Sequence, residues 1–412
     1  MKRLLLLMLI SEIFAYSWAY DFKSGDLYYN ITSNSAPYTV EVTYSSTSRP
    51  SSDDDMNYAN LTSADIPSVV SYNGRTYNVT SIGDFAFSIC SSIISIFIPN
   101  SITSIGIGAF YKCSSLTYIT IPDSITVIKQ HTFSYCSSLS NISIPEKVTT
   151  IKSWAFAYCL SLISITIPNN VTSIEDRSFL NCSSLESVTG GENVKSIGEY
   201  AFASCQSLRY LLPIGKNVTT IGRGCCDFCY SLISIVVDGE NAIYDSRNNC
   251  NAIIETSTNT LIVGCRSTSI PEGVTSIGQS AFATRLHPEV KSINIPSTVT
   301  IIGDHAFALN YLTTLYVRTN TPPLLGPFAF MKSGFDTCQT IPICYIPCGT
   351  LTAYQESDWK NYMSCFIEEC VDLLIIPYDA TSLSNEEHNA NPNHIIYPAT
   401  LENRDSVEMR CN

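Results

Sequence analysis

The chain has 412 residues, of which 45% are hydrophobic and 14% are charged. This composition is too apolar for a disordered chain, and the length allows one large domain or several small ones. The 36 acidic residues outnumber the 23 basic ones and give a formal net charge of −13. This charge disfavours nucleic acids and anionic membranes as partners, because binding to phosphate groups requires a basic face.

Residues 1–19 have the three parts of a secretory signal peptide. Lys2 and Arg3 supply the positive start, and an unbroken apolar run follows from Leu4 to Ile10. The small residues Ser17 and Ala19 fit a cleavage site just after this segment. The apolar run is too short to span a bilayer. We therefore expect a protein that is secreted or held at the cell surface; the alternative is a buried N-terminal helix.

Six phenylalanines recur every 23 residues, and a cysteine follows each of them by three residues. The members of this predicted structural ladder are Phe87, Cys90, Phe110, Cys113, Phe133, Cys136, Phe156, Cys159, Phe179, Cys182, Phe202 and Cys205. A fixed period of about 20–50 residues indicates stacked repeats, and 23 lies in the leucine-rich-repeat range. The sequence therefore predicts a curved leucine-rich-repeat solenoid of about ten units. We expect it to be mostly β-structure with short helical or 3₁₀ turns and a small β-rich N-terminal cap.

One unit shows how the pattern predicts its local structure. Ile119 and Ile121 alternate with outward residues, as in a half-buried strand. Pro122 closes this first strand, because proline cannot donate a hydrogen bond to a neighbouring strand. A second short extended piece follows at residues 124–128, and then a compact turn that buries the ladder phenylalanine and cysteine. Each unit alone leaves an apolar face uncovered, so neighbouring units must stack.

The repeated cysteines are predicted to be reduced packing residues, because a free cysteine behaves as a small buried hydrophobe. A chain of disulfides between neighbouring coils is the alternative, since the coil spacing would permit it. Cys226 and Cys229 have C-x₂-C spacing, but no second such pair completes a zinc site. We therefore expect no metal.

The period breaks after Cys205, where Cys226 takes the place of the expected phenylalanine. An irregular unit follows at about residues 238–270. Within it, the segment IIETSTNTLIVG reads as two short strands around a polar turn. The period resumes at Phe282 and Phe307, and more weakly at Phe330.

The unit LxxIxIPxxVTSIGxxAFxxCxS resembles the BspA-like (Treponema pallidum type) leucine-rich repeat. The ends of the chain are also similar to this family: YDFKSGDLYYNITSNSAPYTVEVTY resembles its N-terminal cap, and CYIPCGTLTAYQESDWKNY resembles its C-terminal cap. The resemblance covers about residues 20–370. It implies surface display or secretion and a role in adhesion to host proteins or to other cells, but it supplies no residue motif for the ligand.

The predicted organisation has five parts. They are a signal peptide at 1–19, an N-terminal β-rich cap at 20–75, the solenoid at 76–318, a C-terminal cap at 319–370 and a tail of unassigned role at 371–412.

The sequence carries no catalytic motif that we recognise. The five histidines lack H-E-x-x-H spacing, and there is no G-x-S-x-G, P-loop or dinucleotide fingerprint. His131 and His305 occupy a variable position of the unit, where we expect solvated side chains. We therefore predict that the protein is not an enzyme and needs no cofactor; a hydrolase within the irregular unit or the tail is the alternative.

The outward positions of the first strands form the candidate binding site, since repeat proteins bind ligands on extended concave faces. The predicted ligand-binding residues are Phe97, Tyr118, Thr120, Asn141, Ser143, Ser164, Thr166, Tyr210 and Tyr316. The same two offsets also include Leu212 and Val236. Small hydroxyls with occasional aromatics suit a protein ligand on host or neighbouring cells. Surface glycan binding and a purely structural role in the cell envelope are the alternatives, because serine and threonine also suit any exposed strand.

Overall fold

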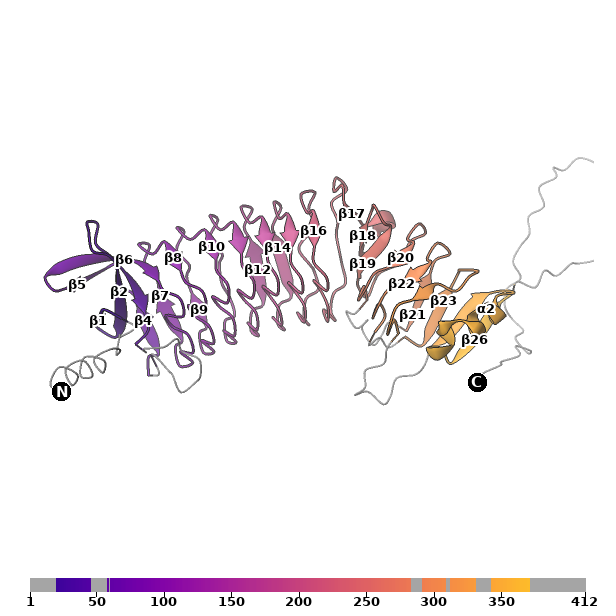
Figure 1. Cartoon of the computed structure of the whole chain (residues 1–412), viewed down its shortest axis with the longest axis horizontal. Helices are drawn as coiled ribbons and strands as arrows, with labels where there is room; N and C mark the ends of the chain where they lie inside the picture. The colour runs from indigo at the N-terminus through magenta and orange to yellow at the C-terminus, as the bar shows by residue number, and fades with distance from the viewer. Residues whose placement is uncertain are drawn as a thin grey trace, which may run out of the picture.

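The computed structural model describes residues 20–45, 58, 60–282, 291–308, 312–330 and 342–370. The protein is a curved rod of stacked coils, which runs from the N-terminal strands to the C-terminal helix (Figure 1). It has about 12 turns with a spacing near 23 residues and very little helix. The predicted leucine-rich-repeat solenoid is therefore confirmed. The predicted signal peptide and the tail at 371–412 lie outside the described residues.

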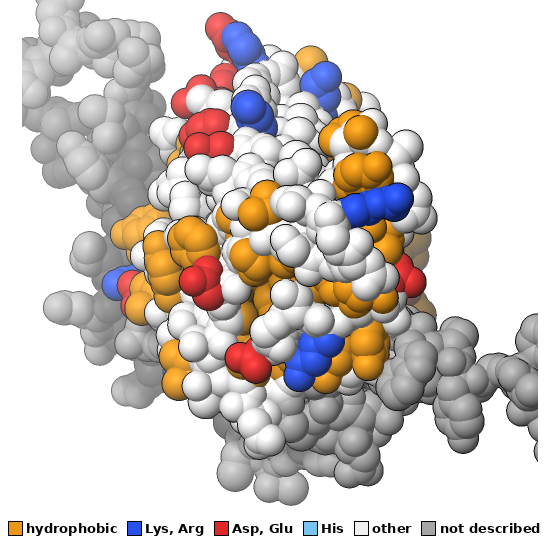
Figure 2. Space-filling view, turned by 90° about the vertical axis from the view of Figure 1, so that its left-hand side faces the viewer, with side chains coloured by type: hydrophobic (Ala, Val, Ile, Leu, Met, Phe, Trp, Pro, Cys, Tyr) orange, Lys and Arg blue, Asp and Glu red, His pale blue; other side chains and the backbone are white. Residues whose placement is uncertain are grey.

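A sheet of order β1-β2-β3-β6-β5 begins the rod. Its strands are β1 (Phe22–Ser24), β2 (Leu27–Ser33), β3 (Thr39–Thr43), β5 (Val69–Tyr72) and β6 (Arg75–Ile82). The strand β8 (Ser104–Ile105) pairs with β6 in parallel, so the sheet continues into the solenoid. Viewed end-on, the N-terminal end shows hydrophobic side chains interspersed with uncharged polar groups and a few charged ones (Figure 2).

The first strands of the coils form parallel stacks along one face, which we call the first-strand face. These strands are β4 (Ser63–Asp65), β7 (Ser95–Phe97), β9 (Tyr118–Ile119), β12 (Ser164–Ile167), β14 (Ser187–Gly190), β21 (Ser292–Ile295), β23 (Thr314–Val317), β25 (Ile343–Pro347) and β26 (Cys365–Glu369). Alternate residues are buried, as the period-two pattern predicts.

The second extended pieces form another set of parallel stacks. Their strands are β10 (Val127–Ile128), β11 (Thr150–Ile151), β13 (Ser173–Ile174), β15 (Ser196–Ile197) and β16 (Thr220–Ile221), followed after the irregular unit by β20 (Ser276–Ile277), β22 (Ile301–Ile302) and β24 (Leu324–Leu325). The register joins residues 23 apart, for example Thr150 with Ser173.

A column of phenylalanine rings fills the corner between the two sets of strands. The rings from Phe87 to Phe202 stack with centroids between 5.2 and 5.8 Å apart, and the stack resumes from Phe282 through Phe307 to Phe330. The corner backbone consists of turns and not of helices. Two residues of most coils have positive φ there, such as His131 and Tyr135.

The ladder cysteines lie beside the phenylalanine column as buried free thiols. Each thiol from Cys113 to Cys205 donates a hydrogen bond to a phenylalanine carbonyl of the preceding coil, at 3.1–3.2 Å. These sulfurs therefore contact backbone and are not bonded to one another. No disulfide joins neighbouring coils along this part of the described chain.

The irregular unit contains the hairpin that the sequence predicts. It comprises β17 (Tyr244–Asp245), η2 (Arg247–Asn249), β18 (Ala252–Glu255) and β19 (Thr260–Gly264), and β18 and β19 pair antiparallel. The hairpin divides the hydrophobic core in two, because Ile253 and Val263 pack with the N-terminal coils whereas Ile254 and Leu261 pack with the C-terminal coils.

The C-terminal end closes with α2 (Leu351–Glu356) and η3 (Asp358–Asn361) beside β26. Tyr354 and Trp359 are fully buried there, and the Trp359 indole N–H donates to the Pro323 carbonyl at 2.8 Å. None of the helices in the described ranges has the length and hydropathy needed to cross a bilayer.

Candidate ligand-binding face

Most of the predicted site residues lie together on the first-strand face. The exposed fractions of Phe97, Tyr118 and Tyr210 are 60%, 58% and 52%, which is high for such large hydrophobic side chains. Thr120, Asn141, Ser143, Ser164 and Thr166 are exposed as well. Tyr316 is only half-buried, with its ring stacked on that of Tyr345 at 5.0 Å.

Leu212 is a correction to the predicted pattern, because its side chain is buried. Its unit is one residue longer than the others, and an isolated bridge at Tyr210 replaces a regular strand. The period-two alternation is therefore lost, and both Leu211 and Leu212 turn inward.

Sequence reasoning missed further apolar residues near this face. Ile94 and Ile163 precede their strands by one residue, and their exposed fractions are 50% and 51%. Ile94 lies in the same coil as Phe97, and the next coil contributes Tyr118 through the β7–β9 pairing. The signal for them in the sequence is an isoleucine directly before the strand, outside the two outward positions within the strand.

A groove of about 220 Å³ opens on the first-strand face between β9 and β12. Its lining residues are Asn141, Ile142, Ser143, Ile144, Glu146, Ser164, Thr166 and Pro168. Residues 139–145 form no strand, and no backbone hydrogen bond of the described chain joins residues 141–144 to the coil on either side. The stack of first strands is therefore interrupted at this coil.

The chemistry of this groove is that of hydrogen bonding. Asn141 offers an amide, three side chains offer hydroxyls and Glu146 offers a carboxylate. The lining contains no histidine, cysteine, lysine or arginine. The groove can therefore hold a polar ligand.

The predicted solvated position of His131 is a second correction. His131 is half-buried, and its ring stacks on Trp154 at 5.7 Å. The Arg177 guanidinium lies over the other members of this column, 5.5 Å from the Trp154 ring and 5.1 Å from the Tyr200 ring. These residues occupy the same position of successive coils, so the stacking of the coils places their side chains next to one another. The His131 and Trp154 rings contact each other and Arg177 contacts the Trp154 and Tyr200 rings, so the column stabilises coil stacking.

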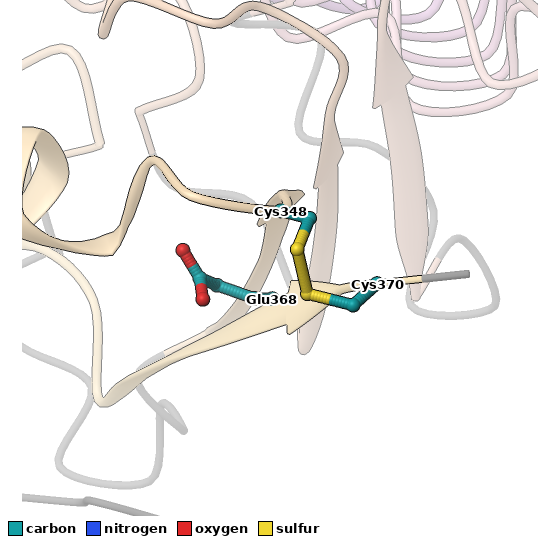
Figure 3. A group of neighbouring side chains, drawn as sticks. All are labelled: Cys348, Glu368 and Cys370. Carbon is teal, nitrogen blue, oxygen red and sulfur yellow. A yellow bond between two sulfur atoms is a disulfide. The ribbon is translucent and has the colours of Figure 1, made fainter. Parts of the chain in front are cut away.

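Two cysteines and a carboxylate meet at the C-terminal end (Figure 3). Cys348 and Cys370 form a disulfide with a Cα–Cα distance of 4.7 Å, so their sulfurs are not thiolate ligands for a metal. The Glu368 carboxylate accepts a hydrogen bond from the Leu351 backbone N–H at the start of α2, at 2.8 Å. The Glu368 carboxylate therefore ties the end of β26 to the first residue of α2.

Replacing both Cys348 and Cys370 with serine is expected to destabilise the C-terminal end by about 3 kcal/mol. The disulfide closes a loop with a sequence separation of 22 residues, and its loss restores chain entropy to the unfolded state. Hydrogen exchange should show lower protection of residues 343–369 and unchanged protection of residues 95–190. Unchanged protection in both segments would contradict the stabilising role.

The fold and this face together define a leucine-rich-repeat scaffold, a class that is typically non-enzymatic. Six copies of the BspA type leucine-rich-repeat region match the chain at residues 56–186, 149–259 and 262–341. The chain belongs to this family, whose members are cell-surface proteins.

Two solved structures illustrate the relationship. A leucine-rich cell surface protein from Faecalibacterium prausnitzii is 28% identical with a TM-score of 0.56, over 75% of this chain and 73% of that one. A leucine-rich repeat protein from Bacteroides ovatus is 27% identical with a TM-score of 0.51, over 79% of this chain and 71% of that one. No curated protein matches the sequence significantly.

Proposed function

We propose that this protein is exported and captures a protein ligand on its first-strand face. The observation that carries the proposal is that the residues predicted to bind a ligand also line a groove in the structure. Four of the predicted binding residues, Asn141, Ser143, Ser164 and Thr166, line the groove where the strand stack is interrupted. The family and the Faecalibacterium cell surface protein support a location outside the cell.

The energetics of such binding would come from the exposed hydrophobic side chains next to the groove. Ile94, Phe97 and Tyr118 lie on the N-terminal side of it and are each at least half exposed. A few buried aromatic anchors commonly supply most of the binding free energy of an interface, and polar residues surround them. The small hydroxyls of the face fit the role of that polar surround.

A glycan is the second candidate ligand. The observation that favours it is the content of the groove, where an amide, hydroxyls and a carboxylate line a volume of about 220 Å³ beside Tyr118. Such groups bind sugar hydroxyls, and an exposed aromatic ring can cover the face of a sugar.

We expect the double variant Phe97→Ala with Tyr118→Ala to lose at least tenfold in affinity, as hot-spot aromatics do. The assay presents the full-length chain to immobilised extracellular-matrix proteins and, in parallel, to a glycan array. The matched control is Phe328→Ala, because Phe328 is also 52% exposed but lies at the corner and away from the first-strand face. If neither surface retains the chain, or if both variants lose affinity equally, the proposal is wrong.

A further inference from the structure

A second cleft, of about 270 Å³, lies where the regular repeats meet the irregular unit. It is lined by Glu186, Ser207, Arg209, Ser231 and Arg266. The two arginines are distant in the sequence, because Arg209 belongs to the coil that follows Cys205 whereas Arg266 follows the hairpin of β18 and β19. The cleft shares no lining residue with the groove at 141–168.

The irregular unit builds this cleft by packing against the preceding coil. The Arg266 backbone N–H donates to the Leu232 carbonyl at 3.3 Å, and the Ser267 hydroxyl donates to the Ile233 carbonyl. These two contacts fix the loop after β19 beside residues 231–233, and they place Arg266 at the same cleft as Arg209. Figure 1 shows that the hairpin of β18 and β19 lies where the regular coils meet the irregular unit.

The charge in the cleft is opposite to that of the whole chain. Two guanidinium groups and one carboxylate leave the lining with a net charge of about +1, whereas the whole chain carries −13. Glu186 and Arg209 occupy equivalent positions of neighbouring coils, joined by a backbone hydrogen bond of 3.0 Å. Their side chains nevertheless form none of the ion pairs in the described part of the chain. The Arg209 guanidinium therefore keeps its donors available.

We propose that this cleft binds a single carboxylate group of a ligand, supplied by an acidic sugar or by an acidic amino-acid side chain. A guanidinium offers paired donors that match the two oxygens of a carboxylate, and the Ser207 and Ser231 hydroxyls can donate as well. The lining has two guanidinium groups and one carboxylate, and this charge balance suits one carboxylate of a ligand. The net charge of the chain opposes a polyanion.

Tyr210 lies next to Arg209 in the chain and is exposed on the first-strand face. The site does not depend on the groove at 141–168, so the proposal can fail without the proposed function failing.

The test measures binding of glucuronate and of N-acetylglutamate to the full-length chain by calorimetry at low ionic strength. Glucose and N-acetylglutamine are the neutral controls. We expect at least one of the two acids to bind and its neutral analogue not to bind. Arg209→Gln and Arg266→Gln should each weaken binding by about tenfold, the effect of one charge-assisted hydrogen bond. Lys195→Gln is the matched control, because Lys195 is an exposed cation outside the cleft.

Each outcome decides the proposal. Binding of glucuronate alone assigns the cleft to an acidic sugar, and binding of N-acetylglutamate alone assigns it to an acidic side chain; binding of both supports recognition of the carboxylate itself. Glu186→Gln should leave binding unchanged or strengthen it, because it removes a like charge. Failure of both acids, or unchanged affinity in both arginine variants with unchanged melting temperatures, would overturn the proposal.

Discussion

Raising the pH from about 8 to about 10 under non-oxidising conditions is expected to unfold the solenoid. The cause is the column of buried thiols, which the folded protein holds in their protonated form. Burial raises the pKa of Cys90 to about 12, and it raises the pKa of Cys113, Cys136, Cys159 and Cys205 well above the ordinary value. In the unfolded chain the same thiols lose their protons near pH 8.5.

The direction in which the free energy of unfolding changes with pH follows from the number of protons that the folded and unfolded states bind. Below the pKa that the thiols have in the unfolded chain, the thiols are protonated in both states. They therefore do not lower the free energy of unfolding in that pH range. Above it the unfolded state loses protons that the folded state retains, and the free energy of unfolding falls as pH rises toward the folded pKa. One pH unit above the unfolded pKa, each thiol contributes a loss of about 1.4 kcal/mol. Five such thiols together lose about 7 kcal/mol, which is comparable with the total stability of many domains.

The measurement is the free energy of unfolding in urea as a function of pH, followed by circular dichroism in oxygen-free buffer. The matched comparison is the double variant Cys136→Ala with Cys159→Ala. It starts from a lower stability at pH 7 because it leaves cavities, but its free energy should fall less steeply with pH, by about 2.8 kcal/mol per pH unit. Parallel curves for the two proteins above pH 9 would show that the buried thiols do not control alkaline unfolding.

The solenoid could be predicted from the sequence because the same residue pattern occurs in successive coils. A phenylalanine every 23 residues defines the stacking distance and the corner at once, so each copy supports the same interpretation. The hairpin of β18 and β19 was predicted as well, because polar turn residues separate two apolar runs there. Local patterns of this kind depend little on the rest of the fold.

The candidate site was predicted only in part, for physical reasons. Asn141 and Ser143 were chosen as outward residues of a strand, but their coil makes no strand, and its pattern of isoleucines and proline does not differ from that of neighbouring coils. The groove therefore arises from how coils stack and not from a local signal. The same holds for Arg209 and Arg266, which meet because of the path of the irregular unit.

Side-chain stacking between coils could also not be predicted from the sequence of a single unit. His131 looked solvated because its position varies between polar, aromatic and glycine residues along the sequence. The structure shows that residues at one position of successive coils contact one another, as Trp154 and Arg177 do. The relevant neighbour of a residue in a solenoid is therefore the residue one period away, and a variable column can still be a packed one.

Phe156→Ala is expected to lower the free energy of unfolding by about 4 kcal/mol, within the range for buried phenylalanines. Phe156 has no exposed surface, and its ring stacks on Phe133 at 5.3 Å and on Phe179 at 5.2 Å. Truncation removes contacts with both neighbouring coils and leaves a cavity that the stacked coils cannot collapse to fill. The measurement is urea denaturation at pH 7, followed by circular dichroism.

The matched control is Phe97→Ala, which makes the same chemical change at a side chain that is 60% exposed. Its effect should stay within about 0.5 kcal/mol, as is usual for surface substitutions. The position of Phe156 in the middle of the column adds a qualitative expectation. Because each coil is stabilised chiefly by its two neighbours, a weak central coil should uncouple the segments on either side and broaden the unfolding transition. Equal losses for the two variants, with transitions of unchanged width, would mean that the phenylalanine column does not couple the coils.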